Sequence, residues 1–118
     1  MITNNDLTTR AIEWALDGLE KRSQVTANNI ANSEVPNFHA DRVDFESQLS
    51  NAIRGGRITR VVDPLVSTSA DAPGLNGNNV QMEDELVTMI KTNLTKNAMI
   101  EAFNYKAGML RAAMRGQV

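Results

Sequence analysis

One stretch of the chain, Met82 to Met114, constrains the fold most strongly, because it carries a sustained seven-residue repeat. Steps of four and three residues stop in turn at Met82, Leu86, Met89, Asn93, Lys96, Ile100, Phe103, Ala107, Leu110 and Met114. Eight of these ten positions are apolar, and no proline interrupts the stretch. Such spacing is typical of a helix that buries one narrow seam against another helix.

The predicted helix is too long to be covered by the rest of the chain. It would span roughly 50 Å at about 1.5 Å per residue, whereas a compact globule of 118 residues is only about 28 Å across. We therefore expect another molecule to bury much of the seam, and we infer that the main role of the protein is assembly. Asn93 and Lys96 leave two interpretations open: a hydrated seam that tolerates polar groups, or selection of one register by a buried asparagine.

Capping residues mark both ends of this helix. Asn78 and Asn79 are predicted to cap its start, with Gln81 placed as in a capping box. Acidic residues fill the first turns and arginines the last turns, as the helix dipole favours. Gly116 is a natural stop. The predicted helix covers residues 80–115.

A second long helix is predicted over residues 6–32, at the opposite end of the chain. Its seam has the same spacing and consists of Ile12, Leu16, Leu19, Ser23, Thr26 and Ile30. Four of these six positions are apolar, and no proline interrupts the helix. The matched seams predict that the two helices pair antiparallel as a coiled-coil-like hairpin.

The middle of the chain, residues 39–79, is predicted to be irregular and variable. Residues 41–53 place apolar side chains on one face, which predicts a short helix ended by the glycine pair 55–56. Residues 58–62 alternate in polarity and predict a brief extended piece. Residues 67–79 are small, polar and rich in turn residues, as expected of a connector.

The predicted fold class is all-α, in a single domain over residues 1–118. Aromatic residues make up only 4% of the chain. Because two long helices with few large side chains bury little surface, we expect the termini of the free subunit to be partly disordered and to gain order on binding.

Composition excludes several classes of protein. The net charge is only -2, from 12 basic and 14 acidic residues, so we expect no nucleic-acid partner. No cysteine is present, which excludes disulfides and thiolate metal sites. No apolar run approaches 18 residues, so we expect no direct membrane insertion. The first ten residues lack the layout of a cleavable signal peptide.

The sequence offers little that could carry chemistry. His39, Asp41, Asp44 and Glu46 lie close together and could contribute metal ligands. However, the chain has one histidine, the acids follow no calcium-loop spacing, and a solvated turn is the better interpretation. No paired catalytic carboxylates, serine–histidine constellation or phosphate-binding loop is present. We therefore expect no enzyme activity, no cofactor, no metal and no small-molecule substrate.

The stretch from Ala27 to Phe38, AlaAsnAsnIleAlaAsnSerGluValProAsnPhe, resembles the N-terminal signature of the bacterial flagellar rod, hook and hook-filament junction proteins. That signature runs Ala-Asn-Asn-(Ile/Leu/Met)-Ala-Asn, two variable residues, then Thr-Pro-Gly-Tyr. Val35 replaces the usual threonine, Asn37 the glycine and Phe38 the tyrosine. Asn37 retains access to the left-handed backbone region.

The C-terminal part of the chain, especially residues 77–86 and 106–116, is similar to the proximal-rod members of the same family. This resemblance implies a structural subunit of the flagellar basal-body rod, located in the periplasm-spanning part of the flagellum. It implies export through the flagellar type III apparatus without signal cleavage. It also implies self-association and neighbours among other rod proteins and the export-gate adaptor.

The seams of the two long helices and the motif from Ala27 to Phe38 together predict the residues of an assembly surface. They are Ile12, Leu16, Leu19, Asn28, Asn29, Ile30, Asn32, Pro36, Phe38, Leu86, Met89, Ile100, Phe103, Leu110 and Met114. A second hypothesis from a different class is a soluble helical adaptor or chaperone that binds a partner helix in solution. A compact, folded monomer would favour the adaptor, and a polymer-prone form the rod subunit.

Overall fold

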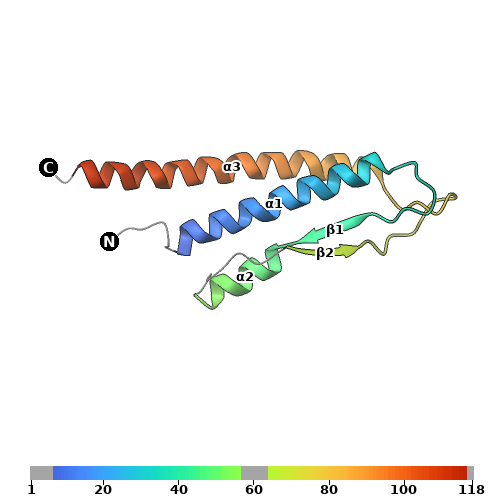
Figure 1. Cartoon of the computed structure of the whole chain (residues 1–118), viewed down its shortest axis with the longest axis horizontal. Helices are drawn as coiled ribbons and strands as arrows, with labels where there is room; N and C mark the ends of the chain where they lie inside the picture. The colour runs from blue at the N-terminus through green and yellow to red at the C-terminus, as the bar shows by residue number, and fades with distance from the viewer. Residues whose placement is uncertain (1–6, 57–63, 117–118) are drawn as a thin grey trace.

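The structure, a computed structural model, describes residues 7–56 and 64–116 of the chain (Figure 1). In chain order the elements are α1 (Leu7–Ala31), β1 (Asp41–Asp44), α2 (Glu46–Arg54), β2 (Leu65–Thr68) and α3 (Met82–Arg115). Both long helices were predicted from the sequence, at 6–32 and 80–115, and both are confirmed. The expected disorder of the termini falls on residues outside the described ranges.

The molecule is elongated. It measures 68 × 26 × 15 Å, and its radius of gyration is 18.1 Å, where a compact chain of this length would have about 14 Å. Its accessible surface is 7916 Å², against roughly 6,300 Å² for a globular protein of this mass. The subunit therefore leaves more surface in water than a globular domain does.

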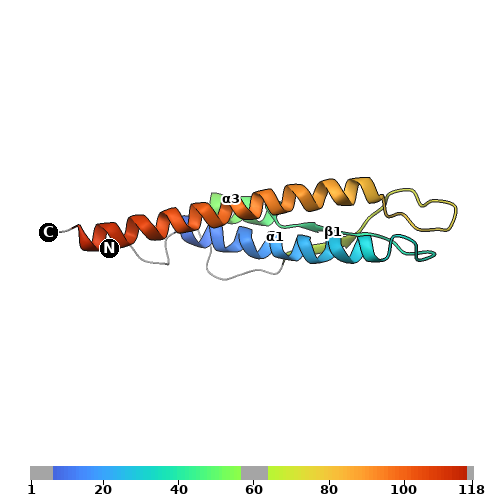
Figure 2. The same ribbon diagram turned by 90° about the horizontal axis from the view of Figure 1, so that it is seen from above.

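Helix α1 is the middle layer of the structure. Helix α3 runs antiparallel along one side of it, and the two helices lie side by side in both ribbon views (Figure 1, Figure 2). The β1–β2 hairpin and α2 lie against another side of α1. Within the described residues, no helix combines the length and apolarity needed to cross a membrane.

The chain is mostly helical, as predicted, but the all-α class is not exact, because β1 and β2 form a two-stranded antiparallel sheet. Asp41 lies opposite Thr68, and Asp44 lies opposite Leu65. The predicted helix from Asp41 is correspondingly wrong in its first part, since α2 begins only at Glu46. Its end is confirmed, because the backbone N–H of Gly55 closes the last turn onto the carbonyl of Asn51.

The reason for this difference is tertiary. Val43 is buried against α1, and the backbone of Asp41 pairs with a side chain of that helix. Neither contact is visible in local spacing, which only records that residues 41–53 carry a helical pattern. The extended piece predicted at residues 58–62 lies outside the described residues.

A small apolar core joins α1 to the hairpin and to α2. It consists of Ala15, Leu19, Val43 and Phe45, with Val25, Leu49 and Met99 packed against it. Phe45 lies directly over Gly18 of α1, and a Cβ at position 18 would overlap the ring. Gly18 is therefore the residue that lets an aromatic ring approach the helix backbone.

Candidate functional site

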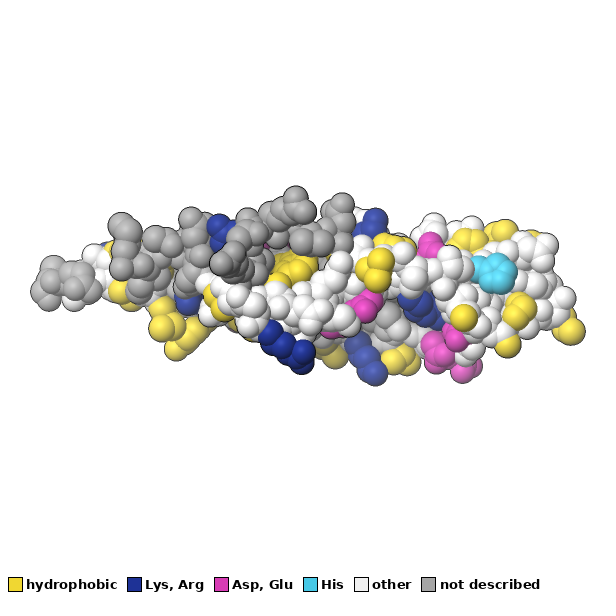
Figure 3. Space-filling view, turned by 90° about the horizontal axis from the view of Figure 1, so that it is seen from below, with side chains coloured by type: hydrophobic (Ala, Val, Ile, Leu, Met, Phe, Trp, Pro, Cys, Tyr) yellow, Lys and Arg dark blue, Asp and Glu magenta, His cyan; other side chains and the backbone are white. Residues whose placement is uncertain are grey.

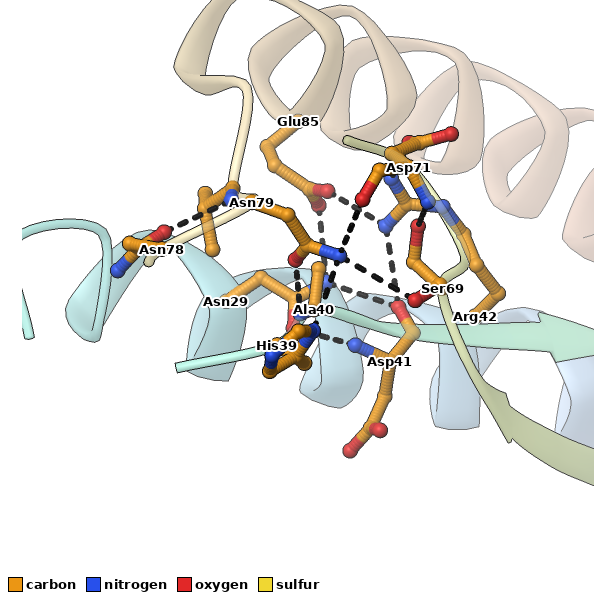
Figure 4. Close-up of polar contacts among 11 residues, drawn as sticks. Asn29, His39, Ala40, Asp41, Arg42, Ser69, Asp71, Asn78, Asn79 and Glu85 are labelled. Carbon is orange, nitrogen blue, oxygen red and sulfur yellow. Dashed lines mark hydrogen bonds and ion pairs between the residues drawn. The ribbon is translucent and has the colours of Figure 1, made fainter. Parts of the chain in front are cut away.

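Three buried asparagines join the ends of α1, β1 and α3 (Figure 4). The side chain of Asn29 binds both backbone groups of Asp41: its Oδ1 accepts from the N–H at 3.0 Å, and its Nδ2 donates to the carbonyl at 2.9 Å. The amide thus takes the place of a neighbouring strand on the open side of β1. This satisfies backbone groups that would otherwise be costly to bury.

The side chains of Asn79 and Asn78 likewise bind backbone groups, here in the irregular segments around them. Oδ1 of Asn79 accepts from the N–H of Ala40 at 2.7 Å, while its Nδ2 donates to the carbonyls of Ser69 and Asp71. Nδ2 of Asn78 donates to the carbonyls of Asn32 and Val35. The connector before α3 is therefore tied to the segment that follows α1.

These contacts overturn the predicted helix cap. The N-cap of α3 is Gln81, whose side chain makes no capping hydrogen bond, and the helix begins at Met82. Asn78 and Asn79 lie outside the helix because their amides are occupied by backbone groups from distant segments. An asparagine side chain can either cap a helix or bind the backbone of another segment. The presence of asparagine before a helix therefore does not show which of these two roles it has.

A buried ion pair completes this junction. Glu85, in the first turn of α3, is only 2% exposed. Its carboxylate accepts from Nδ2 of Asn29 at 3.2 Å and from the guanidinium of Arg42 at 2.7 Å. A carboxylate buried this deeply requires such partners. The junction therefore links the asparagine-rich end of α1, strand β1 and the start of α3.

Several polar contacts cross the interface between α1 and α3. Nζ of Lys96 lies 2.7 Å from Oε2 of Glu20, and Oγ of Ser23 lies 3.8 Å from the sulfur of Met89. The hydrogen bond from Lys96 lowers the pKa of Glu20. Together with the Asn29–Glu85 contact, these pairs fix an antiparallel register. Lys96 of the predicted seam is thus an ion-pair partner of α1, while Asn93 is exposed.

An arginine clamps the core residue Phe45 from the outside. The guanidinium of Arg22 lies 4.9 Å from the centre of the Phe45 ring and binds Glu46 at 2.6 Å. It also donates to the carbonyl of Val43. The hydrogen bond from Arg22 lowers the pKa of Glu46, and partial burial opposes that shift.

The predicted seam of α3 does not follow one face of the hairpin. Leu86, Ile100 and Met114 are exposed, whereas Met89, Phe103 and Leu110 are half-buried. A row with a seven-residue repeat drifts by about 20° per heptad around a straight helix. Exposed and half-buried residues therefore alternate along the seam, and its last residue, Met114, is exposed.

The remaining predicted assembly residues also differ in how exposed they are. In α1, Leu19 is buried, while Ile12, Leu16 and Ile30 are half-buried. In the motif, Asn29 is buried, Asn32 and Phe38 are half-buried, and Asn28 and Pro36 are exposed. Asn32 donates from Nδ2 to the carbonyl of Asn28 as α1 ends. The structure does not gather these fifteen residues into one surface.

Helix α3 instead carries a second apolar surface, facing away from α1. We name it the outer face of α3; it comprises Leu86, Val87, Ile90, Leu94, Ala98, Tyr105 and Met109. Ile90 is 60% exposed and Leu94 is 65% exposed. Large apolar side chains that remain exposed along a long helix are candidates for contact with another molecule. The search for alternating steps of four and three residues missed this face, because most of its residues are four positions apart.

The junction residues Arg42, Asn78, Asn79 and Glu85 were also missed as interacting residues. Only their residue types could have indicated this role. Asparagine can hydrogen-bond to buried backbone groups, and an arginine can pair with a buried carboxylate. His39 is exposed (Figure 3), and its Nδ1 lies 3.4 Å from Nδ2 of Asn79. Among the described residues, no group of three or more His, Cys, Asp or Glu side chains could hold a metal ion.

Comparison with known proteins gives a consistent family of relatives. No family model matches the chain. The chain is 27% identical to "Flagellar basal body rod protein FlgB" of Aeromonas hydrophila, over 89% of this chain and 90% of that protein. It is 26% identical to the FlgB protein of Bacillus subtilis (strain 168), over 92% and 94% of the two chains. It is 27% identical to FlgB of Escherichia coli (strain K12), over 98% and 99%. The similarity to FlgB rod proteins thus extends over nearly the whole chain.

Proposed function

We propose that this protein is a structural subunit of the flagellar basal body rod, which assembles with other rod components through its two long helices. The observation that carries the proposal is the outer face of α3. Large apolar side chains that a subunit leaves exposed along one helix are the mark of an interaction surface. The FlgB relatives, which bear the name of rod proteins, support the same role.

The elongated shape supports this role as well. A subunit that exposes more surface than a globular domain gains stability when neighbours cover it, because burial of apolar surface contributes about 25 cal/mol per Å². In this proposal residues 1–118 act as one rod-protein domain. Coiled-coil-like contacts with neighbouring helices cover α3 as the subunit joins the rod.

Further parts of the proposal concern partners and route. The subunit contacts copies of itself, other rod proteins and the export-gate adaptor. It reaches the periplasm-spanning rod through the flagellar type III apparatus, without cleavage of a signal peptide. It acts without a cofactor or small-molecule substrate and is not an enzyme, in keeping with relatives named as flagellar basal body rod proteins.

A soluble adaptor or chaperone is not favoured. The similar curated proteins are named as rod proteins over nearly the full length of the chain.

The test is complementation in a motile bacterium whose own FlgB rod protein has been deleted. The wild-type chain should restore swimming, and antibody detection should place it in purified basal bodies. Recovery of the chain only in the cytosolic fraction, bound to another secreted protein, would instead support the adaptor.

A further inference from the structure

Two loops form a rigid apolar tip at one end of the molecule. Leu75 is 112% exposed and Val35 is 45% exposed. We define the tip as Val35, Pro36 and Leu75; it lies beyond the start of α3, at the end where Figure 3 shows hydrophobic side chains in contact with solvent. A large apolar side chain held fully in water is a candidate anchor for a partner.

The tip is held in place by contacts between the two loops. The N–H of Asn37 donates to the carbonyl of Asn76 at 3.0 Å, and Asn78 binds the carbonyl of Val35 at 2.7 Å. Asn37 has φ 62° and Gly77 has φ 79°, so both occupy the left-handed region. A side chain at position 77 would overlap Asn37. Little freedom remains to be lost when such a tip binds.

An apolar groove lies away from the tip, beside Met99 in the middle of α3. It is formed where α1 begins and α2 ends, beneath α3, and it has a volume of about 330 Å³. Its apolar lining includes Leu7, Ala11, Ile12, Leu49, Ile53 and Met99. Ile53 is 44% exposed at its mouth. We name it the end groove.

The two ends also carry opposite charge. Glu34, Glu83 and Asp84 are exposed around the tip, on the loop after α1 and the first turn of α3. Arg111 and Arg115 are exposed in the last turns of α3, at the other end, and Arg54 is exposed in the last turn of α2, after the groove residue Ile53. Complementary charge of this kind orients two copies head to tail.

We propose that the tip of one copy of this chain inserts Leu75 and Val35 into the end groove of a second copy, head to tail. The inference rests on the proposed rod function for its expectation that copies assemble. Because the tip and the groove are separate surfaces of one elongated molecule, each copy keeps one unused surface after pairing. Such a heterologous contact adds further copies along one direction.

The test uses two variants of the full chain, each with one surface blocked. Leu75→Asp disables the tip and Ile53→Asp disables the end groove. Sedimentation velocity over a range of concentrations should show wild-type oligomers and should show each variant alone about tenfold or more weaker in association. An equal mixture should form a dimer and nothing larger, since only one intact tip and one intact groove then meet. Ser67→Asp, an exposed change on β2 opposite Arg42, should associate as the wild type does.

The outcomes are decisive. A mixture that stays monomeric while the wild type associates would overturn the contact, as would unchanged association of Leu75→Asp, which would point to the outer face of α3. A wild-type chain that remains monomeric at every concentration would exclude a second copy as occupant. If that chain nevertheless restores swimming in the complementation test, the rod function stands and only the head-to-tail contact fails.

Discussion

Nδ2 of Asn29 lies 3.2 Å from Oε2 of Glu85, and this buried hydrogen bond joins the end of α1 to the start of α3. Residues 56 positions apart in the sequence are thereby fixed against each other. The same asparagine binds both backbone groups of Asp41. One side chain thus sets the relative position of two helices and a strand.

Asn29→Asp should therefore destabilise the fold. The change removes the donor and places a second carboxylate beside that of Glu85, where like charges repel in a buried site. We expect the free energy of unfolding to fall by about 2–4 kcal/mol. Urea denaturation at neutral pH measures the change. The matched control is Asn28→Asp on the exposed neighbouring position, which should alter stability by less than about 0.5 kcal/mol. Equal losses in the two variants would argue against the junction.

Gly18→Ala should also destabilise the protein, because the new methyl group overlaps the ring of Phe45. Overpacking of this kind costs about 1–3 kcal/mol. Gly108, on α3, has open space around the position of a Cβ. Gly108→Ala should raise the free energy of unfolding by up to about 1 kcal/mol through helix propensity alone. Thermal and urea unfolding of both variants give the sign of each change in the free energy of unfolding. A Gly18→Ala variant that is more stable than the wild type would contradict the packing of Phe45.

Stability should fall in acid in part through Glu46. The Arg22 hydrogen bond holds the pKa of Glu46 in the folded protein below its usual value of 4.5. A carboxyl with a lowered folded pKa contributes stability above its unfolded pKa and loses it as the pH falls through the folded pKa. The contribution of Glu46 should therefore be present at neutral pH and disappear below about pH 4.5.

Urea midpoints of the wild type and of Glu46→Gln, measured from pH 7 down to pH 3, test this directly. The variant should be less stable than the wild type at pH 7, and the two should converge in acid. Glu20, whose pKa is lowered by Lys96, contributes in the same direction and remains in both proteins. Parallel curves for the wild type and the variant would show that the Arg22–Glu46 pair does not act this way.

Ile90→Asp should block assembly without unfolding the subunit. Ile90 is 60% exposed on the outer face of α3, so a carboxylate there remains hydrated in the monomer. In an assembled rod the same carboxylate would be desolvated, at a cost of several kcal/mol. We expect loss of swimming and of basal-body incorporation, with an unchanged circular dichroism spectrum and an undiminished exported fraction. Ser67→Asp supplies the control for an added charge, and normal motility of Ile90→Asp would exclude the outer face from the interface.

Several features of the fold could be predicted from the sequence. Both long helices and the end of α2 at its glycine pair follow from local spacing, because helical periodicity and helix stops depend on neighbouring residues. The positive φ of Asn37, which is 62°, was expected from the turn that follows Pro36. Similarity to flagellar rod proteins was also visible in the motif from Ala27 to Phe38.

Other features were decided only in three dimensions. The side of α3 that meets α1 depends on Glu20, Ser23 and Asn29, which lie far away along the chain. Strand β1 exists because Asn29 and β2 supply partners for its backbone, although its residues carry a helical pattern. Sequence alone thus determined where the helices run, since each helix is stabilised by bonds within itself. The tertiary structure determined which faces are covered and which remain free, because burial depends on segments that meet only after the chain has folded.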